Sequence, residues 1–403
     1  MELFRLEHKK LWRKRSVKIS VLVCFIYIVI FGNILSFQWF GFGSSDDYTS
    51  AFGNNFDGYT IIKNSQEHAQ MFGDELTDET LQQLVRDYQQ MNAAGLEKEL
   101  EKTDWAIINS CLGTLYPELH QTEINQTMIN YVDPDKLTGF YERREHAIQE
   151  FLENNGQVGA EMEYLLKMEQ NVEKPFRYEW VDGWSQLLGS MIADLGVVMA
   201  LFLAIVLSSL FAGEWHDNTS SLVLTTTNGW KKLAFAKIFT GLAFTAELFV
   251  ILAIPCILAQ LFFIGISGWD MPIQNIKLIA IAPINMLQAE IYEYAFALLG
   301  AIGFAGIVMF ISSTVKNNVL SLLFSLGVVY IPMMIAEYLP YELQKALDLL
   351  PLVGSSTDIF RTNVFNIFGK IIWSPYLLIT IPVLIGICFI PLAVKNWSRR
   401  LKV

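Results

Sequence analysis

Long apolar stretches alternate with polar segments along this chain, and their lengths predict its main elements. A helix needs roughly 20 mostly apolar residues to cross the hydrocarbon core of a bilayer. Six stretches are about that long, and one large polar block separates the first from the second. They occupy residues 19–40, 187–212, 233–266, 292–312, 318–339 and 373–394. We therefore expect an all-α integral membrane protein with six transmembrane helices.

The polar block, residues 41–186, has the pattern of a folded domain. One helical pattern of apolar side chains falls within residues 78–100, at Leu81, Leu84, Val85 and Tyr88. A second comprises Ile148, Phe151, Leu152, Leu165 and Leu166. Several aromatic residues argue against disorder, and a block of this length is large enough to bury a core. We expect a large, mainly helical domain here.

Three shorter segments complete the pattern. Residues 1–18 combine seven basic residues with a few apolar ones, which predicts an interfacial basic helix lying on a membrane leaflet. Residues 313–317 leave room only for a tight turn between two spans. Residues 340–372 interleave apolar and polar side chains, which indicates an amphipathic or re-entrant segment and not a further span.

A cleaved signal peptide is the alternative interpretation of the N-terminus, because a basic segment followed by an apolar run is its signature. Here the apolar run of residues 19–40 is long enough to span a bilayer, and no A-x-A cleavage site follows it. We therefore expect this run to be the first transmembrane helix.

Charge is distributed unevenly along the chain. The net charge is −11, but residues 41–186 hold 27 acidic and 10 basic residues, so the rest of the chain is basic. A block this acidic repels nucleic acid and anionic headgroups. We expect no nucleic-acid partner.

Basic residues in the short loops predict the orientation, because they accumulate on the cytoplasmic side. With the N-terminus inside, fourteen Lys and Arg fall in inner segments and four in short outer loops. This asymmetry places both termini in the cytoplasm. It places residues 41–186 outside the membrane, as an extracytoplasmic domain.

No motif in the sequence predicts catalysis. The chain lacks the G-x-x-x-x-G-K-[ST] phosphate loop, the G-x-S-x-G elbow and the H-E-x-x-H metal motif. Three of its four cysteines lie in apolar runs, and Cys111 alone falls in the polar block, so no disulfide can form within that block. We expect no metal, no cofactor in this chain and no enzymatic activity of its own.

The connection between the second and third spans, residues 213–232, is the most informative segment. It contains an apolar patch with Leu222 and Leu224, followed by a polar break that ends at Gly229. Such a segment is typical of a short helix that presents a surface to a cytoplasmic partner. An ordinary interfacial loop is the alternative that the spacing leaves open.

This segment resembles the coupling region of the ABC-type-2 permeases, the membrane subunits of ABC exporters. In that family a Glu follows the second span, then come a Leu-rich helix, a Gly-containing turn and a Lys that opens the third span. The corresponding positions here are Glu214, Thr219, Leu222, Leu224, Thr226, Gly229 and Lys237. Asn218 and Trp230 depart from the family pattern. The resemblance covers residues 1–40 and 187–403, and leaves out the acidic block.

The resemblance implies the permease subunit of a bacterial ABC exporter in the cell membrane. It implies a homodimer or heterodimer of permeases, contact with membrane lipid, and a separate cytoplasmic ABC ATPase subunit that binds ATP and Mg²⁺. Residues 187–403 would form a five-helix membrane domain with its coupling region at 213–232. The cargo implied is a peptide, an antimicrobial or a lipid-like molecule.

Ionisable residues within spans are costly and often functional. Asp194, Glu247, Glu290 and Glu293 are therefore candidates for a translocation path. For Glu247 we expect a role inside the helix bundle. For Glu290 and Glu293, at the expected outer mouth of the fourth span, simple exposure to outer water is the favoured alternative.

Two other classes of protein remain as alternatives. A four-span mechanotransmitting ABC permease also carries a large domain after its first span, but here five apolar stretches follow the domain. A membrane receptor or an envelope assembly protein would use the outer domain to bind a ligand. The short polar tail after Val394 argues against a receptor with its own signalling module.

Overall fold

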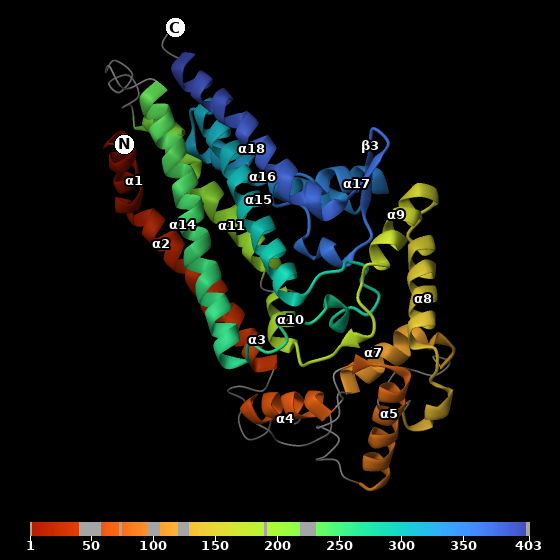
Figure 1. The fold of residues 1–403 in the computed structure, drawn as a ribbon. Coiled ribbons are helices and arrows are strands. Elements are labelled where there is room, and N and C mark those ends of the chain that lie inside the picture. The colour runs from red at the N-terminus through yellow and green to blue at the C-terminus, as the bar shows by residue number, and fades with distance from the viewer. Residues whose placement is uncertain are drawn as a thin grey trace.

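The computed structural model describes residues 2–39, 58–71, 75–95, 105–119, 129–188, 192–217 and 231–399. Most of these residues are helical, and the strands among them form two small two-stranded sheets (Figure 1). Six described helices are long and apolar enough to cross a membrane. The prediction of a mostly helical chain with six span-length helices is confirmed.

The first candidate span, Arg15–Phe37, is built from three consecutive helical pieces and follows a separate N-terminal helix, α1 (Glu2–Arg13). The pieces are α2 (Arg15–Phe25), a π-helical turn η1 (Ile26–Gly32) and α3 (Asn33–Trp39). The second span comprises most of α11 (Ile192–Leu207) and all of α12 (Ser209–His216). The other four are α14 (Lys231–Phe263), α15 (Met286–Thr314), α16 (Asn318–Ala336) and α18 (Ser374–Arg399).

Asparagine caps mark the starts of two of these helices. The Asn285 side chain accepts a hydrogen bond from the backbone of Gln288, whose side chain bonds back to Asn285, so a capping box begins α15. Asn317 caps α16 by accepting from two backbone N–H groups. Because α15 ends at Thr314 and α16 begins at Asn318, the tight turn predicted at residues 313–317 is confirmed.

Helices α15 and α18 form the most extensive helix pair of the bundle. Glycines allow their backbones to approach, as small residues do between membrane helices. A Cβ atom placed on Gly306 would lie 2.6 Å from the carbonyl oxygen of Gly386. The reciprocal substitution at Gly386 would meet the backbone of Gly303 at 2.6 Å. Neither position has room for a side chain.

The polar block forms helices α4 (Gly58–Met71), α5 (Asp78–Ala93), α7 (Trp105–Leu115), α8 (Phe140–Asn154), α9 (Gly159–Glu169) and α10 (Asp182–Gln186). Strands β1 (Glu75–Leu76) and β2 (Phe176–Arg177) pair antiparallel. One hydrophobic core unites much of this block, and it contains the helical face predicted for α5: Leu81, Leu84, Val85 and Tyr88. The described part of the block is mostly helical, and the apolar face predicted for residues 78–100 is buried.

Some buried residues of the polar block pack into the core of the membrane helices. Ile148 and Leu152 of α8 and Leu165 of α9 are buried, but they belong to the core that continues into the membrane helices. Conversely, Ile264 and Leu278, from the α14–α15 connection, contribute to the core of the block. The block therefore packs directly on the membrane helices.

The segment predicted to be amphipathic or re-entrant, residues 340–372, contains no span-length helix. It folds as α17 (Tyr341–Asp348), a 3₁₀ turn η7 (Ser356–Phe360) and a hairpin of β3 (Val364–Ile367) and β4 (Lys370–Trp373). Ile359 and Val364 are buried in the main core, whereas Phe368 at the hairpin tip is exposed.

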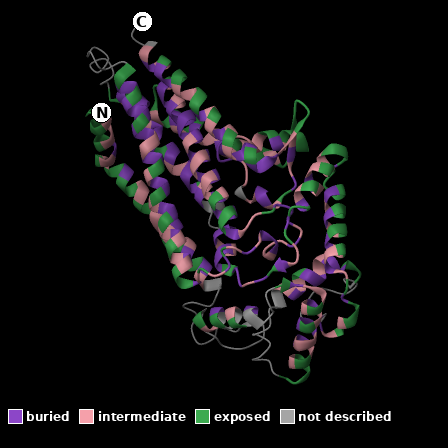
Figure 2. Cartoon of the chain, viewed as in Figure 1, coloured by how far each residue is buried: buried purple, intermediate pink, exposed green. Residues whose placement is uncertain are grey.

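The two chain ends lie at the same end of the helix bundle (Figure 1). Helices α4, α5 and α7 lie at the opposite end, and α8 and α9 flank the bundle near α17. Figure 2 shows buried residues on the facing sides of the helices and exposed residues on their outer sides. This arrangement accords with an even number of spans.

Candidate functional site

Four charged side chains meet at the end of the bundle that carries both chain ends. Lys237, near the start of α14, lies 2.9 Å from Glu214 of α12 and 2.9 Å from Glu7 of α1. Lys10 of α1 also contacts Glu214, at 2.7 Å. The side chains of Lys237 and Glu214 are only 2% and 7% exposed. We call Glu7, Lys10, Glu214 and Lys237 the terminal charge cluster.

Each charge in this cluster has a partner of opposite sign. Lys237 also donates to the backbone carbonyl of Leu210, at 3.1 Å. Burial makes an unpaired charge expensive, and breaking a buried pair commonly costs about 3–5 kcal/mol. The cluster therefore holds α1, α12 and α14 together in one arrangement.

The predicted coupling region, residues 213–232, begins beside one member of the terminal charge cluster, Glu214, and another member, Lys237, follows its end. Glu214 precedes residues 218–230 in the chain, and Lys237 follows them. The other coupling residues predicted, Thr219, Leu222, Leu224 and Gly229, lie outside the described residues. Of the coupling residues predicted from sequence, the structure thus brings Glu214 and Lys237 together.

A small cleft opens beside the cluster, with a volume of about 50 Å³. Lys14, Ser209 and Asp217 line it together with the cluster itself. Lys14 reaches the Ser209 hydroxyl at 3.5 Å. Burial lowers the pKa of Lys14, and the positive charges of Lys237 and Lys10 lower it further. The cleft is therefore lined by three basic side chains, whose charge Glu7, Glu214 and Asp217 balance.

Glu247 occupies a different place from the one expected. Its carboxylate lies 2.9 Å from Nε2 of His8 and accepts a hydrogen bond from Nε1 of Trp12 at 2.8 Å. The Glu247 side chain is 39% exposed. This carboxylate thus links α14 to α1 from a partly exposed position, whereas the expectation was a place inside the helix bundle.

Glu290 and Glu293 of α15 are buried, with 4% and 0% of their surface exposed. The expectation that they face outer water is therefore wrong. None of their four carboxyl oxygens has a hydrogen-bond partner among the described residues. Asp194 lies in α11, but its side chain is outside the described part of the chain. Among the described side chains, no hydrogen bond or ion pair joins Glu290 or Glu293 to Glu247.

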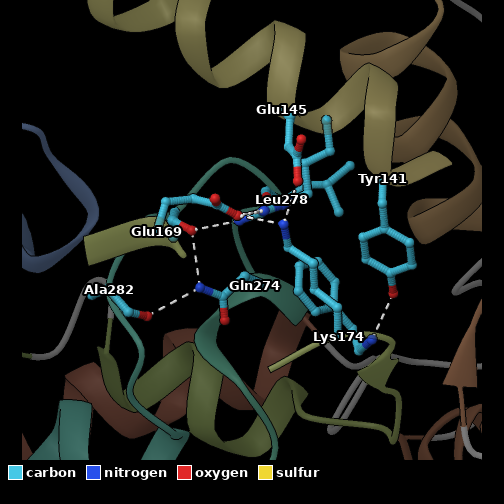
Figure 3. Close-up of polar contacts among 10 residues, drawn as sticks. Tyr141, Glu145, Glu169, Lys174, Gln274, Leu278 and Ala282 are labelled. Atoms are coloured by element: carbon cyan, nitrogen blue, oxygen red, sulfur yellow. Dashed lines mark hydrogen bonds and ion pairs between the residues drawn. The ribbon is translucent and has the colours of Figure 1, made fainter. Parts of the chain in front are cut away.

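A second polar junction, around Arg144, joins the polar block to the membrane helices. Arg144 of α8 is fully buried and pairs with Glu169 of α9 at 2.5 Å. It also donates to the backbone carbonyls of Leu278 and Ala280, at 2.8 and 2.9 Å. Both carbonyls belong to the α14–α15 connection (Figure 3). The Arg144 guanidinium group thus connects the polar block to the α14–α15 connection.

Neighbouring side chains complete this junction. Gln274 donates to the carbonyls of Ala280 and Ala282, and Lys174 pairs with both Glu169 and Glu145 (Figure 3). The sequence interpretation missed Arg144. The available signal was its spacing, because Arg144 falls four residues from Phe140 and four from Ile148, on the buried face of α8.

Among the described residues, no group of three or more His, Cys, Asp or Glu side chains is arranged to hold a metal ion. The chain matches no protein-family model, no curated protein and no solved structure. Its function must therefore be inferred from its own residues, of which the terminal charge cluster and the buried carboxyl groups of α15 are the most unusual.

Proposed function

We propose that the chain is the membrane-spanning permease subunit of a bacterial ABC exporter. The observation that carries this proposal is the terminal charge cluster. Its ion pair between Glu214 and Lys237 joins the two helices that lead into and out of residues 218–230. In the proposed function the coupling region, residues 213–232, contacts a separate ATPase subunit, which binds ATP and Mg²⁺.

The cluster gives a physical route for coupling. A displacement of residues 218–230 by the ATPase would move α12 and α14 as one unit, because separating Glu214 from Lys237 would leave buried charges unpaired. Glu7 and Lys10 would carry the same displacement to α1 and the first span. Three spans would then respond together to closure of the ATPase.

In the proposed arrangement both chain ends and residues 218–230 are cytoplasmic, and residues 41–186 lie outside the cell membrane. The shared location of the chain ends supports this orientation (Figure 1). Two permease subunits, identical or related, would work together in contact with membrane lipid. The outer domain would receive or gate the cargo, which we take to be a peptide, an antimicrobial or a lipid-like molecule.

The alternatives differ in what they require of the fold. A four-span mechanotransmitting permease needs three spans after its outer domain, whereas five span-length helices follow the polar block here. A receptor or an envelope assembly protein needs no contact between the 218–230 connection and an ATPase. In the exporter that contact exists, and the buried pair of Glu214 and Lys237 would connect it to α12 and α14.

The test is affinity purification of the tagged chain after co-expression with its cognate ABC ATPase. Replacing Leu222 and Leu224 together by Ala should weaken co-purification, because truncating apolar anchors at an interface commonly costs about 1–3 kcal/mol. Glu214→Ala should retain complex but uncouple ATP hydrolysis from transport. The matched control replaces Leu384 and Leu392, which are exposed on α18. Wild-type co-purification by the Leu222/Leu224 variant would refute the contact.

A further inference from the structure

The carboxyl groups of Glu290 and Glu293 are buried without the partners that buried charges require. They lie nearly one turn apart near the start of α15, on a helix that is long and apolar enough to span a membrane. No described Lys, Arg or His forms an ion pair with either. Glu290 is 4% exposed and Glu293 is 0% exposed, so bulk solvent does not reach either carboxyl group.

A separate element adds a third buried carboxyl group to this region. The turn η7 packs against α15, and its Asp358 is 3% exposed. Oδ1 of Asp358 accepts a hydrogen bond from Asn363, but Oδ2 has no partner among the described residues. The hydroxyl of Tyr292, which interacts electrostatically with Asp358 and Glu293, is also buried and unpartnered.

Among the described residues no basic side chain acts on Glu290 or Glu293 themselves, although Arg361 acts on the neighbouring Asp358. The titratable residues that interact electrostatically with this part of α15 are Tyr292 and Tyr294 of the same helix, Cys256 of α14 and Asp358 of η7. An ionised carboxylate in such a place is strongly disfavoured, and two of them one turn apart also repel each other. A neutral carboxylic acid avoids both penalties.

We propose that Glu290 and Glu293 form a proton-binding site. In the conformation described here each carboxyl group holds one proton, and each releases that proton to water when residues 340–372 move away from α15. A proton fits the site because it needs no cavity and no set of ligating side chains. A metal ion does not, since the described residues offer no metal-binding group.

Asp348 and Asp358 provide a link between this site and solution. Asp348, at the end of α17, is half-buried, and burial together with the charge of Asp358 raises its pKa to about 6. A carboxyl group of this kind exchanges protons readily near neutral pH.

The consequence for transport rests on the proposed function, whereas proton occupancy does not. If the chain is an exporter, the pair changes the charge at one mouth of the bundle once per cycle. Transport should then depend on the pH at that mouth. Replacing both residues by Gln, which is neutral at every pH, should flatten that dependence.

The test is modification of the purified full chain by dicyclohexylcarbodiimide, an apolar reagent that reacts with protonated carboxyl groups. Peptide mapping by mass spectrometry at neutral pH should find the adduct on Glu290 or Glu293. Glu247 is the internal control, because it also lies on a span-length helix but pairs with His8 and Trp12. It should stay unmodified, and the Glu290→Gln, Glu293→Gln double variant should lose the adduct.

Absence of the adduct from both residues would overturn the proposal, because the pair would then be ionised and held by some other cation. The peptide map of the modified wild-type chain decides whether the pair is protonated, even if the double variant fails to fold. A wild-type adduct combined with unchanged pH dependence of transport in the double variant would overturn only the role in the cycle. Failure of the chain to transport at all would refute the proposed function and leave the proton site standing.

Discussion

Single buried charges fasten the polar block of this protein to its membrane helices, and Arg144 is the clearest case. Replacing it by Met leaves Glu169 with only Lys174 as an ionic partner and leaves the carbonyl of Leu278 without its donor, whereas the carbonyl of Ala280 keeps Gln274. Breaking a buried pair costs about 3–5 kcal/mol, and we expect a loss of about 3 kcal/mol in the free energy of unfolding because Lys174 remains.

Thermal unfolding of the purified chain in detergent measures this loss. Arg86→Met is the matched control, since Arg86 pairs with Asp135 at the surface of the same block. Exposed ion pairs contribute at most about 1 kcal/mol. Equal losses for the two variants would show that Arg144 does not carry the junction.

Asp348 makes stability depend on pH. Its pKa is about 6 in the folded chain, against an ordinary value of 3.8, because of burial first and the charge of Asp358 second. The folded state therefore binds this proton more tightly than the unfolded state. The resulting stabilisation is complete below about pH 4 and is lost as pH rises through about 6.

Asparagine does not titrate, so Asp348→Asn should remove this loss of stability with rising pH. Between about pH 4 and pH 7, the midpoint temperature of unfolding should therefore fall less in the variant than in the wild type. Thermal unfolding in a series of buffers provides the measurement. Parallel curves for the two proteins would show that Asp348 is not responsible.

Some of the residue contacts could be predicted from the sequence, and others could not. Glu214 and Lys237 were identified as site residues, and the structure brings them together. Their pairing with Glu7 and Lys10 was beyond the sequence, because these contacts join positions more than 200 residues apart. Glu290 and Glu293 were misplaced because polar residues near the end of an apolar stretch usually reach water, and here the α10 and η7 segments cover that end.

At the scale of elements, hydropathy and spacing were reliable because they depend on local pattern. The six span-length helices, the turn at residues 313–317 and the buried face of α5 all follow from periodicity. The sharing of core between α8, α9 and the membrane helices does not, since one amphipathic face looks the same whatever it packs against. The close approach of α15 and α18 could likewise not be predicted from hydropathy.

That approach leads to a prediction about glycines. Gly306→Ala places a methyl group 2.6 Å from the carbonyl oxygen of Gly386, so the helices must separate. Overpacking of this kind costs about 1–3 kcal/mol. The midpoint of thermal unfolding should fall.

Gly196→Ala is the matched control, because the nearest atom to its Cβ is a side-chain carbon of Leu352 at 4.0 Å. This substitution should be neutral or slightly stabilising, since Ala favours helix over Gly by about 1 kcal/mol. A loss of stability at Gly196 as large as that at Gly306 would contradict the packing account.

At the scale of the whole molecule, the orientation in the membrane is open to a direct test. Val158, in the polar block, and Lys316, in the α15–α16 turn, are both exposed. In a background with Cys388 replaced by Ser, cysteines introduced at these two sites should react differently in intact cells. An impermeant maleimide should label Val158→Cys at once and Lys316→Cys only after permeabilisation. Labelling of Lys316→Cys in intact cells would contradict the six-span topology.

We propose that this chain is the membrane subunit through which a separate ATPase drives export. The most direct measurement is ATP hydrolysis in vesicles that contain the chain, the cognate ABC ATPase, or both. We predict no hydrolysis by the chain alone, cargo-stimulated hydrolysis when both are present, and loss of that stimulation in Lys237→Met, which breaks the terminal charge cluster. Hydrolysis by the ATPase that is the same with and without the chain would contradict the account.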